Sequence, residues 1–154
     1  MKTTLFTLIL LFASLSFAEK ASYFQDDGIF MEGYDVVSYI KDQKATKGQA
    51  AHKITHDGTT FYFSSQENKD LFSKSPDKYI PAYKGWCAYA MADSGSLVSV
   101  DPKTFKVING KTYFFYNTFW ADTLKKWNKK IKDDPKKETE LVNSADSFWQ
   151  KKHN

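Results

Sequence analysis

The chain has 154 residues and a formal net charge of +4, from 22 basic and 18 acidic side chains, and every basic side chain is a lysine. A length of this order predicts one domain with a single core. The excess of positive charge is small, and no arginine is available to bind phosphate in a bidentate manner. Composition therefore argues against a nucleic-acid-binding protein.

The first eighteen residues, MKTTLFTLILLFASLSFA, have the pattern of a secretory signal peptide. A lysine precedes an apolar run from Leu5 to Leu15, and the small residues Ser16 and Ala18 form a cleavage site. The apolar run is shorter than the roughly 20 residues that a bilayer crossing needs. We therefore expect residues 1–18 to be removed and the mature chain to reach the periplasm or the extracellular space without a transmembrane span.

Residues 19–27 form an N-terminal segment that we expect to lie loosely on the surface. From residue 28 onward, GIFMEG is typical of a short strand, and YDVVSYIKD places apolar side chains at helical spacing. The stretch AHKITHDGTTFYFSS is typical of a β-hairpin, because Asp57-Gly58 is a favoured type I′ turn. Its register predicts three pairs on the apolar side: His56 with Thr59, Ile54 with Phe61, and His52 with Phe63.

Two helical stretches and a second hairpin follow. The first helix is predicted to begin at Ser64, with a capping box that involves Glu67, and a short helical turn begins at Pro76. FKVINGKTYFFY repeats the hairpin signature around Asn109-Gly110. We find no internal repeat in the sequence, and we expect the two hairpins to form one small antiparallel sheet packed with helices.

The C-terminal part has the clearest helical periodicity. Steps of four, three and four predict a helix whose buried face carries Trp120, Leu124, Trp127 and Ile131. A last helix is predicted to begin with Asp134 as its cap, followed by Pro135. The predicted fold is therefore α+β, with one domain over residues 28–131 and a C-terminal helix in residues 132–154 that packs on it.

Cys87, the single cysteine, lies in the apolar run WCAYAM. In an oxidising compartment an unpaired cysteine is a buried apolar side chain, a partner in an intermolecular disulfide, a metal ligand or a reactive thiol. Gly85 lies close by and would let another group approach. The residues themselves leave these alternatives open.

His52 is the imidazole that would join Cys87 at a soft-metal site. His52 and His56 lie four residues apart on one strand, roughly 13 Å along an extended backbone, so they cannot easily bind the same ion. We expect His56 in solvent and His153 in a disordered chain end. As a nucleophile, Cys87 would need His52 as base and Asp35 to orient that base. The sequence contains no phosphate-binding loop, metalloprotease helix or nucleophile elbow, so we assign no catalytic residue and favour a protein that is not an enzyme.

Four stretches resemble small exported YHS-domain proteins: GYDVVSY, THDGTTFYFSSQENKDLFSKSPDKY, PAYKGWCAYA and VDPKTFKVINGKTYFFYN. The resemblance covers roughly residues 28–131. It implies a link with copper and other heavy metals, which relatives bind through one cysteine after the aromatic strand and another in the helix. Those places correspond here to Ser64 or Ser65 and to Asn68, so that cluster is absent. The exported relatives share the Gly-x-Cys-Ala-Tyr segment, and some are described as selenoproteins, which favours chemistry at Cys87.

These observations lead to three hypotheses about function. In the first, Cys87, with His52 and Tyr89 nearby, binds a thiophilic metal such as copper without turnover, because copper(I) accepts few, soft ligands. In the second, Cys87 is a redox thiol that passes through a sulfenic acid or a mixed disulfide. In the third, Cys87 belongs to the core of a module that binds a small ligand or a protein. The candidate pocket residues are Tyr34, Asp35, Tyr83, Trp86 and Tyr89. We expect a monomer or a weak oligomer of unknown partner, and the exposure of Cys87 separates the third hypothesis from the others.

Overall fold

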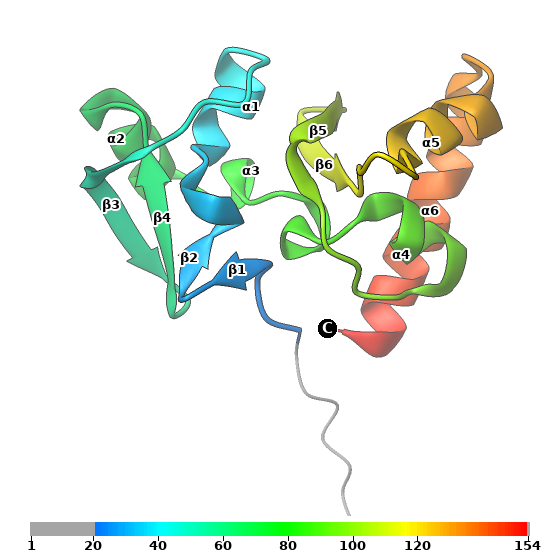
Figure 1. Cartoon of the computed structure of the whole chain (residues 1–154), viewed down its shortest axis with the longest axis horizontal. Helices are drawn as coiled ribbons and strands as arrows, with labels where there is room; N and C mark the ends of the chain where they lie inside the picture. Colours follow the sequence, from blue (N-terminus) through cyan, green and yellow to red (C-terminus); the bar gives the residue numbers. More distant parts are fainter. Residues whose placement is uncertain (1–20, 154) are drawn as a thin grey trace, which may run out of the picture.

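The computed structural model describes residues 21–153, so the predicted signal peptide lies outside the described residues. The fold is mixed α+β, as the sequence predicts (Figure 1). The first half of the described chain contains β1 (Gln25–Asp26), β2 (Ile29–Phe30), the 3-10 helix η1 (Met31–Gly33), α1 (Val36–Lys41), β3 (Gln49–His56), β4 (Thr59–Phe63), α2 (Gln66–Lys74) and α3 (Pro76–Tyr79). The second half contains the 3-10 helix η2 (Ala82–Gly85), α4 (Ala88–Ser94), β5 (Asp101–Ile108), β6 (Lys111–Phe115), α5 (Thr123–Ile131) and α6 (Pro135–Lys152).

The two predicted hairpins form, but they lie in separate sheets. Strands β3 and β4 belong to a four-stranded mixed sheet in the order β1-β2-β4-β3, in which β2 and β4 are parallel, whereas β5 and β6 form a sheet of their own. The expectation of one antiparallel sheet is therefore wrong. The physical reason is that α1 stands between the hairpins, where the ring of its Tyr39 packs edge-on against Phe105 and Phe114 of the second sheet (Figure 1).

The two hairpins repeat the same arrangement at a shift of 52 residues. Shifted by that number, Gln49–His56 of β3 becomes Asp101–Ile108 of β5, and Thr59–Phe63 of β4 becomes Lys111–Phe115 of β6. Each hairpin also has a register irregularity at the corresponding place, which in β3 lies between Gln49 and Lys53. The expectation of no internal repeat is therefore wrong for the structure. We call residues 31–80 the first repeat and residues 83–152 the second repeat.

The equivalence extends to the segments before the hairpins. Residues of η1 and η2 adopt the same left-handed backbone, with φ of 47°, 52° and 78° at Met31, Glu32 and Gly33 and of 53°, 51° and 93° at Tyr83, Lys84 and Gly85. A backbone hydrogen bond of 2.9 Å from Asp35 N to Thr46 O in the first repeat corresponds to one of 3.0 Å from Cys87 N to Val98 O in the second. Asp35 and Cys87 therefore hold the same place, each at the N-cap of its helix.

The repeats differ after their second strands. In the first, β4 ends at Phe63 and Ser65 caps α2; in the second, β6 ends at Phe115 and α5 is capped only at Asp122. Relative to the first repeat, the second therefore contains five additional residues before its helix, which we call the insertion turn (residues 117–121). The second repeat also ends in the 18-residue helix α6, where the first has the four-residue α3.

The insertion turn explains why one predicted core residue is not in the core. Trp127 and Ile131 of α5 are buried, as the helical periodicity predicts, but Trp120 is 89% exposed. The prediction for Trp120 is wrong because the Asp122 carboxylate accepts a hydrogen bond from Lys125 N at 3.0 Å and starts the helix after Trp120.

Both ends of the described chain are tied to the domain. Tyr23 is buried and packs edge-on against Phe30 and Phe61, so the expectation of a loose N-terminal segment does not hold for this residue. His153, expected in a disordered end, lies 2.8 Å from Gly95 O through its Nε2, and its own carbonyl accepts a hydrogen bond from Ala21 N. No helix within residues 21–153 combines the length and apolar character needed to cross a membrane.

Candidate functional site

Cys87 is fully buried at the start of α4. Its Sγ accepts a hydrogen bond from Tyr116 N at 3.4 Å and lies 3.5 Å from Thr123 Oγ1. Thr123 Oγ1 in turn donates to Tyr116 O at 2.9 Å. The thiol thus links the start of α4 to the chain that leaves β6 and to the start of α5, and it is not in contact with solvent.

Asp35 makes the corresponding link in the first repeat with a carboxylate. It is fully buried, and its Oδ1 accepts a hydrogen bond from Val37 N at 2.9 Å. Its Oδ2 accepts from Ser64 N at 2.8 Å, from Ser64 Oγ at 2.6 Å and from Asn68 Nδ2 at 2.7 Å. Four hydrogen bonds therefore satisfy the Asp35 carboxylate within the fold. Through them, this acceptor connects the start of α1 to the end of the first hairpin.

The resemblance would place metal-binding cysteines at Ser64 or Ser65 and at Asn68, and of these Ser64 and Asn68 are the residues that bind Asp35. Because the hydroxyl and the amide of Ser64 are engaged in this way, the cap of α2 is Ser65, whose Oγ accepts from Asn68 N at 3.1 Å. The predicted start at Ser64 is therefore one residue too early. These polar side chains connect α1, β4 and α2 within the first repeat.

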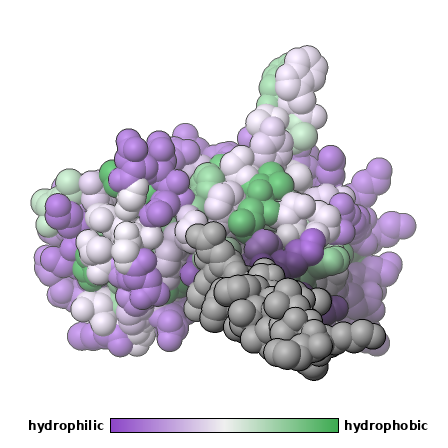
Figure 2. Space-filling model, turned by 90° about the horizontal axis from the view of Figure 1, so that it is seen from below, coloured by the Kyte–Doolittle hydropathy of each residue, from purple (hydrophilic) through white to green (hydrophobic). Residues whose placement is uncertain are grey.

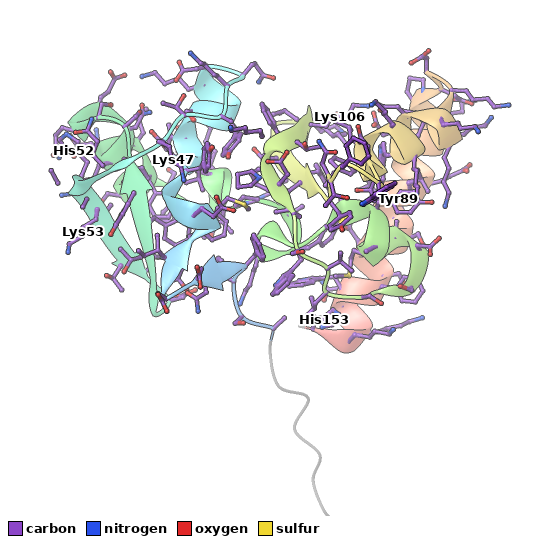
Figure 3. The ribbon with its side chains drawn as sticks, viewed as in Figure 1. Lys47, His52, Lys53, Tyr89, Lys106 and His153 are labelled. Carbon is purple, nitrogen blue, oxygen red and sulfur yellow. The ribbon has the colours of Figure 1, made fainter. Side chains whose placement is uncertain are left out.

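His52 is not in the register that the sequence predicts. The pairs His56 with Thr59 and Ile54 with Phe61 are confirmed, but Phe63 pairs with Gln49, because the bulge displaces the intervening residues. His52 lies on β3, the edge strand of the first sheet, and Figure 3 shows it at the opposite side of the molecule from Tyr89. Its Nδ1 is buried without a hydrogen-bond partner. Within residues 21–153 no three His, Cys, Asp or Glu side chains are grouped so that they could hold a metal ion.

The predicted pocket residues do not gather around one space. Tyr34 lies under the ammonium of Lys47, and Tyr89 lies under that of Lys130, with Nζ 4.2 Å and 4.7 Å from the ring centroids. Trp86 packs against Phe24 and donates from Nε1 to Ser22 O at 2.9 Å. Asp35 is enclosed in its hydrogen bonds, as described above. Of this predicted group, Tyr83 lines a cavity on the second repeat.

This cavity has a volume of about 450 Å³ and lies where η2, the turn of the second hairpin and α6 meet. The residues that line it are Pro81, Ala82, Tyr83, Lys84, Ile108, Asn109, Lys111, Tyr113, Asp146 and Trp149. Such a volume lies within the range of small-molecule sites. Aromatic side chains and two lysines are among the lining residues.

The polar groups of the cavity are held in fixed positions. Lys111 Nζ donates to Asp77 O at 2.8 Å and to Ile80 O at 3.0 Å, and burial lowers the pKa of this ammonium. Tyr83 Oη donates to Asp146 Oδ1 at 2.8 Å; burial, together with this bond, raises the pKa of the phenol. Burial also raises the pKa of Tyr113. Burial thus favours the neutral form of both phenols and also disfavours the charged form of Lys111, whose ammonium is held by its two carbonyl acceptors.

Sequence reasoning did not find Lys111, Asp146 or Trp149 as site residues. Trp149 packs inward from α6 against Tyr83, but the pattern of a helix does not say which part of the domain its inward face covers. The signal that could have helped is the internal repeat. It shows that the second hairpin has α6 beside it at the place where the first repeat has only the short α3.

Comparison with known proteins identifies one family. The YHS domain matches residues 37–83, so the chain contains a YHS domain. The match runs from α1 to η2 and covers most of the first repeat, and it ends at Tyr83, the first residue of the second repeat, before Cys87. No curated protein and no solved structure matches the chain.

Proposed function

We propose that this YHS-domain protein is a non-catalytic binding protein. Its ligand is a small anion with a flat apolar body, such as an aromatic carboxylate, which enters the cavity between η2, the β5–β6 turn and α6. The observation that carries the proposal is the convergence of Lys84 and Lys111 with Tyr113 and Trp149 around one space. The complete burial of Cys87 supports a binding module with the cysteine in its core over functions that need a reachable thiol.

The charges of the lining favour an anion. Lys84 and Lys111 contribute two positive charges against the one negative charge of Asp146, whose Oδ1 accepts a hydrogen bond from Tyr83. Lys84 Nζ donates to Ala21 O at 2.8 Å and lies over the ring of Tyr23, so the ligand is expected to contact Lys111. An ammonium group has three N–H donors, one more than the two carbonyl bonds of Lys111 use. A ligand carboxylate would accept such a bond and would also reduce the cost of burying the lysine.

The walls favour a flat apolar body. Tyr83 lies between two aromatic neighbours, with ring centroids 5.9 Å from Tyr113 and 5.8 Å from Trp149. Aromatic side chains bury large areas at low entropic cost and pack on flat ligands in offset or edge-on arrangements. Lined in this way, the cavity combines a general apolar attraction with one charged anchor, as small-ligand sites commonly do.

The proposal is tested with 2-naphthoate and its neutral analogue 2-naphthamide, by calorimetric titration. We expect naphthoate to bind at least about tenfold more tightly than naphthamide, since a hydrogen bond to a charged group contributes roughly 1.5–3 kcal/mol. Lys111→Gln should remove most of this preference. Lys103→Gln, which removes a charge from an exposed place on β5 outside the cavity, is the matched control and should leave both affinities unchanged.

Trp149→Leu separates the walls from the charge. It should weaken both probes by a similar factor, because it removes aromatic contact and leaves the lysines in place. Equal affinity of the parent protein for naphthoate and naphthamide, or an unchanged preference in Lys111→Gln, would contradict the proposal. Urea unfolding of each variant checks that the fold is retained.

A further inference from the structure

Phe119 and Trp120 form an aromatic pair in the insertion turn that is almost completely exposed. Their side chains are 91% and 89% exposed, and their ring centroids lie 4.9 Å apart in an edge-to-face arrangement. Leu97, at 39%, is the remaining large apolar residue that is exposed within residues 21–153. Two adjacent large rings in water are costly to maintain, and such features mark interaction sites.

The insertion turn presents this pair on an ordered support. Asn117 and Asp122 form a backbone bridge at its base, and Thr118 N donates to Ala121 O at 2.8 Å. Asn117 Nδ2 also donates to Thr104 Oγ1 of β5 at 2.9 Å. The two rings therefore stand at the tip of a closed turn that is anchored to the second sheet.

The fold itself does not require these residues. The first repeat passes from β4 to α2 through Ser64 and Ser65, and it builds the same hairpin-to-helix connection without an insertion turn. Both exposed rings lie in the part that the second repeat adds. The aromatic pair is ordered and apolar, and the first repeat has no equivalent of it. Binding to a partner explains such a pair better than a contribution to the stability of the fold does.

Positive charge lies directly beside the pair. Helix α5, with the sequence TLKKWNKKI, begins three residues after Trp120 and contains four lysines and no acidic residue. Lys125, Lys126 and Lys129 are exposed. The nearby carboxylate of Asp122 is occupied by Lys125, through its backbone amide at 3.0 Å and its ammonium at 3.3 Å. On the face shown in Figure 2, the surface is largely hydrophilic and hydrophobic residues form only small areas.

We propose that the insertion turn and α5 bind the surface of an anionic lipid bilayer. Phe119 and Trp120 enter the interface between headgroups and acyl chains, and the α5 lysines contact the acidic headgroups. Aromatic side chains favour the membrane interface, and each lysine near an anionic surface adds to the attraction. Two rings flanked by the polar, exposed Asn117 and Thr118 are too small an apolar area for a stable protein interface, whereas a bilayer needs only shallow insertion.

The test is co-sedimentation of the chain from residue 19 onward with two kinds of vesicle: phosphatidylcholine alone, and phosphatidylcholine mixed equally with phosphatidylglycerol. We expect binding to the mixed vesicles at low ionic strength, with weaker binding as salt is added. The double variant Phe119→Ser/Trp120→Ser should lose at least about tenfold in partitioning, whereas Leu97→Ser should not change it. The triple variant Lys125→Gln/Lys126→Gln/Lys129→Gln should lose roughly fivefold per lysine.

A matched triple variant, Lys44→Gln/Lys53→Gln/Lys74→Gln, removes the same charge from exposed places in the first repeat and should retain most of the binding. Three results would overturn the proposal. The first is the absence of binding to the mixed vesicles, and the second is unchanged binding by the double aromatic variant, which is also the result expected if the pair binds a protein. The third is an equal loss in the two lysine triples, which would show attraction by net charge alone.

Discussion

The two repeats use different chemistry for the same task. In the first, the buried carboxylate of Asp35 holds the start of α1 and the end of the hairpin together through four hydrogen bonds. In the second, the thiol of Cys87 does so with one amide at 3.4 Å and one hydroxyl at 3.5 Å. Sulfur is a weak acceptor, so the second connection contributes less polar stabilisation. The comparison explains a solitary cysteine as a weak variant of a structural connection, without any need for a reactive thiol.

The second repeat has packing where the first has hydrogen bonds. Helix α6 covers α4 with a buried face that includes Ala145, while Gly95 at the end of α4 lies so close to Phe148 that an added Cβ would meet its ring at 2.9 Å. Trp127 is fully buried and donates from Nε1 to Glu138 at 2.9 Å. The stability of the second repeat should therefore depend on α6, and that of the first on the Asp35 cluster.

The largest effect is expected from Asp35→Ala. The substitution removes the acceptor of the buried Asn68 amide and of the partly buried Ser64 donors, and it removes the cap of α1. We expect the free energy of unfolding to fall by about 3–5 kcal/mol, from the sum of a lost cap and unsatisfied buried donors. Urea unfolding followed by circular dichroism measures this change.

Asp35→Cys is the informative companion, because it gives the first repeat the side chain of the second. It should be destabilising by an amount close to that of Asp35→Ala, since a thiol cannot accept four hydrogen bonds. If Asp35→Cys were nearly as stable as the parent, the two positions would be interchangeable and the contrast between the repeats would be wrong.

Local signals explain which parts of the fold the sequence predicts. Two turns and one helix cap are as predicted: the turns at Asp57-Gly58 and Asn109-Gly110 and the cap at Asp134. Each of them is determined by residues that are adjacent in the sequence. Trp120 was misplaced because the helical spacing continues past the true helix start, which is capped by Asp122. The internal repeat was missed because equivalent positions keep their backbone conformation and not their side chains, as Asp35 and Cys87 illustrate.

An intermediate effect is expected at high pH, with one tyrosine from each repeat as reporter. Burial raises the pKa of Tyr39, whose hydroxyl donates to Pro102 O, and that of Tyr83, whose hydroxyl donates to Asp146. The folded protein keeps these protons when the unfolded chain loses them near pH 10. The stability that they contribute is therefore complete below pH 10 and is lost above it, by up to about 1.4 kcal/mol per pH unit for each tyrosine.

Tyr39→Phe and Tyr83→Phe should each reduce this alkaline slope by about one proton. Burial lowers the pKa of Lys111, so just below the ordinary pKa of lysine this group makes the stability rise with pH. The alkaline slopes of the variants are therefore compared with that of the parent, and the parent slope is not interpreted alone. The measurement is urea unfolding at a series of pH values. The two substitutions are expected to act on the same unfolding transition. If Tyr39→Phe changed the pH dependence of one urea transition and Tyr83→Phe that of another, the two repeats would unfold separately and would not form one cooperative unit.

The candidate site is harder to predict from sequence than the fold, for a physical reason. The cavity joins residues from η2, the second hairpin and α6 that are up to about 70 positions apart, and only the packing of α6 brings them together. Sequence patterns do show that Tyr83 is one of several aromatic residues around Cys87. They do not show that Tyr34 lies under Lys47 and Tyr89 under Lys130, outside that space.

The smallest effect is expected at Cys87. Cys87→Ser keeps a small acceptor for the amide of Tyr116 and should cost about 1 kcal/mol or less, and Cys87→Ala should cost about 1–2 kcal/mol because it leaves that amide unsatisfied. A disulfide reagent should not label the thiol of the folded protein and should label it as the chain unfolds, with the same urea dependence as the loss of structure. Rapid labelling of the folded protein at neutral pH would show that the second repeat opens around its weak connection, and the redox and metal hypotheses would then regain their physical basis.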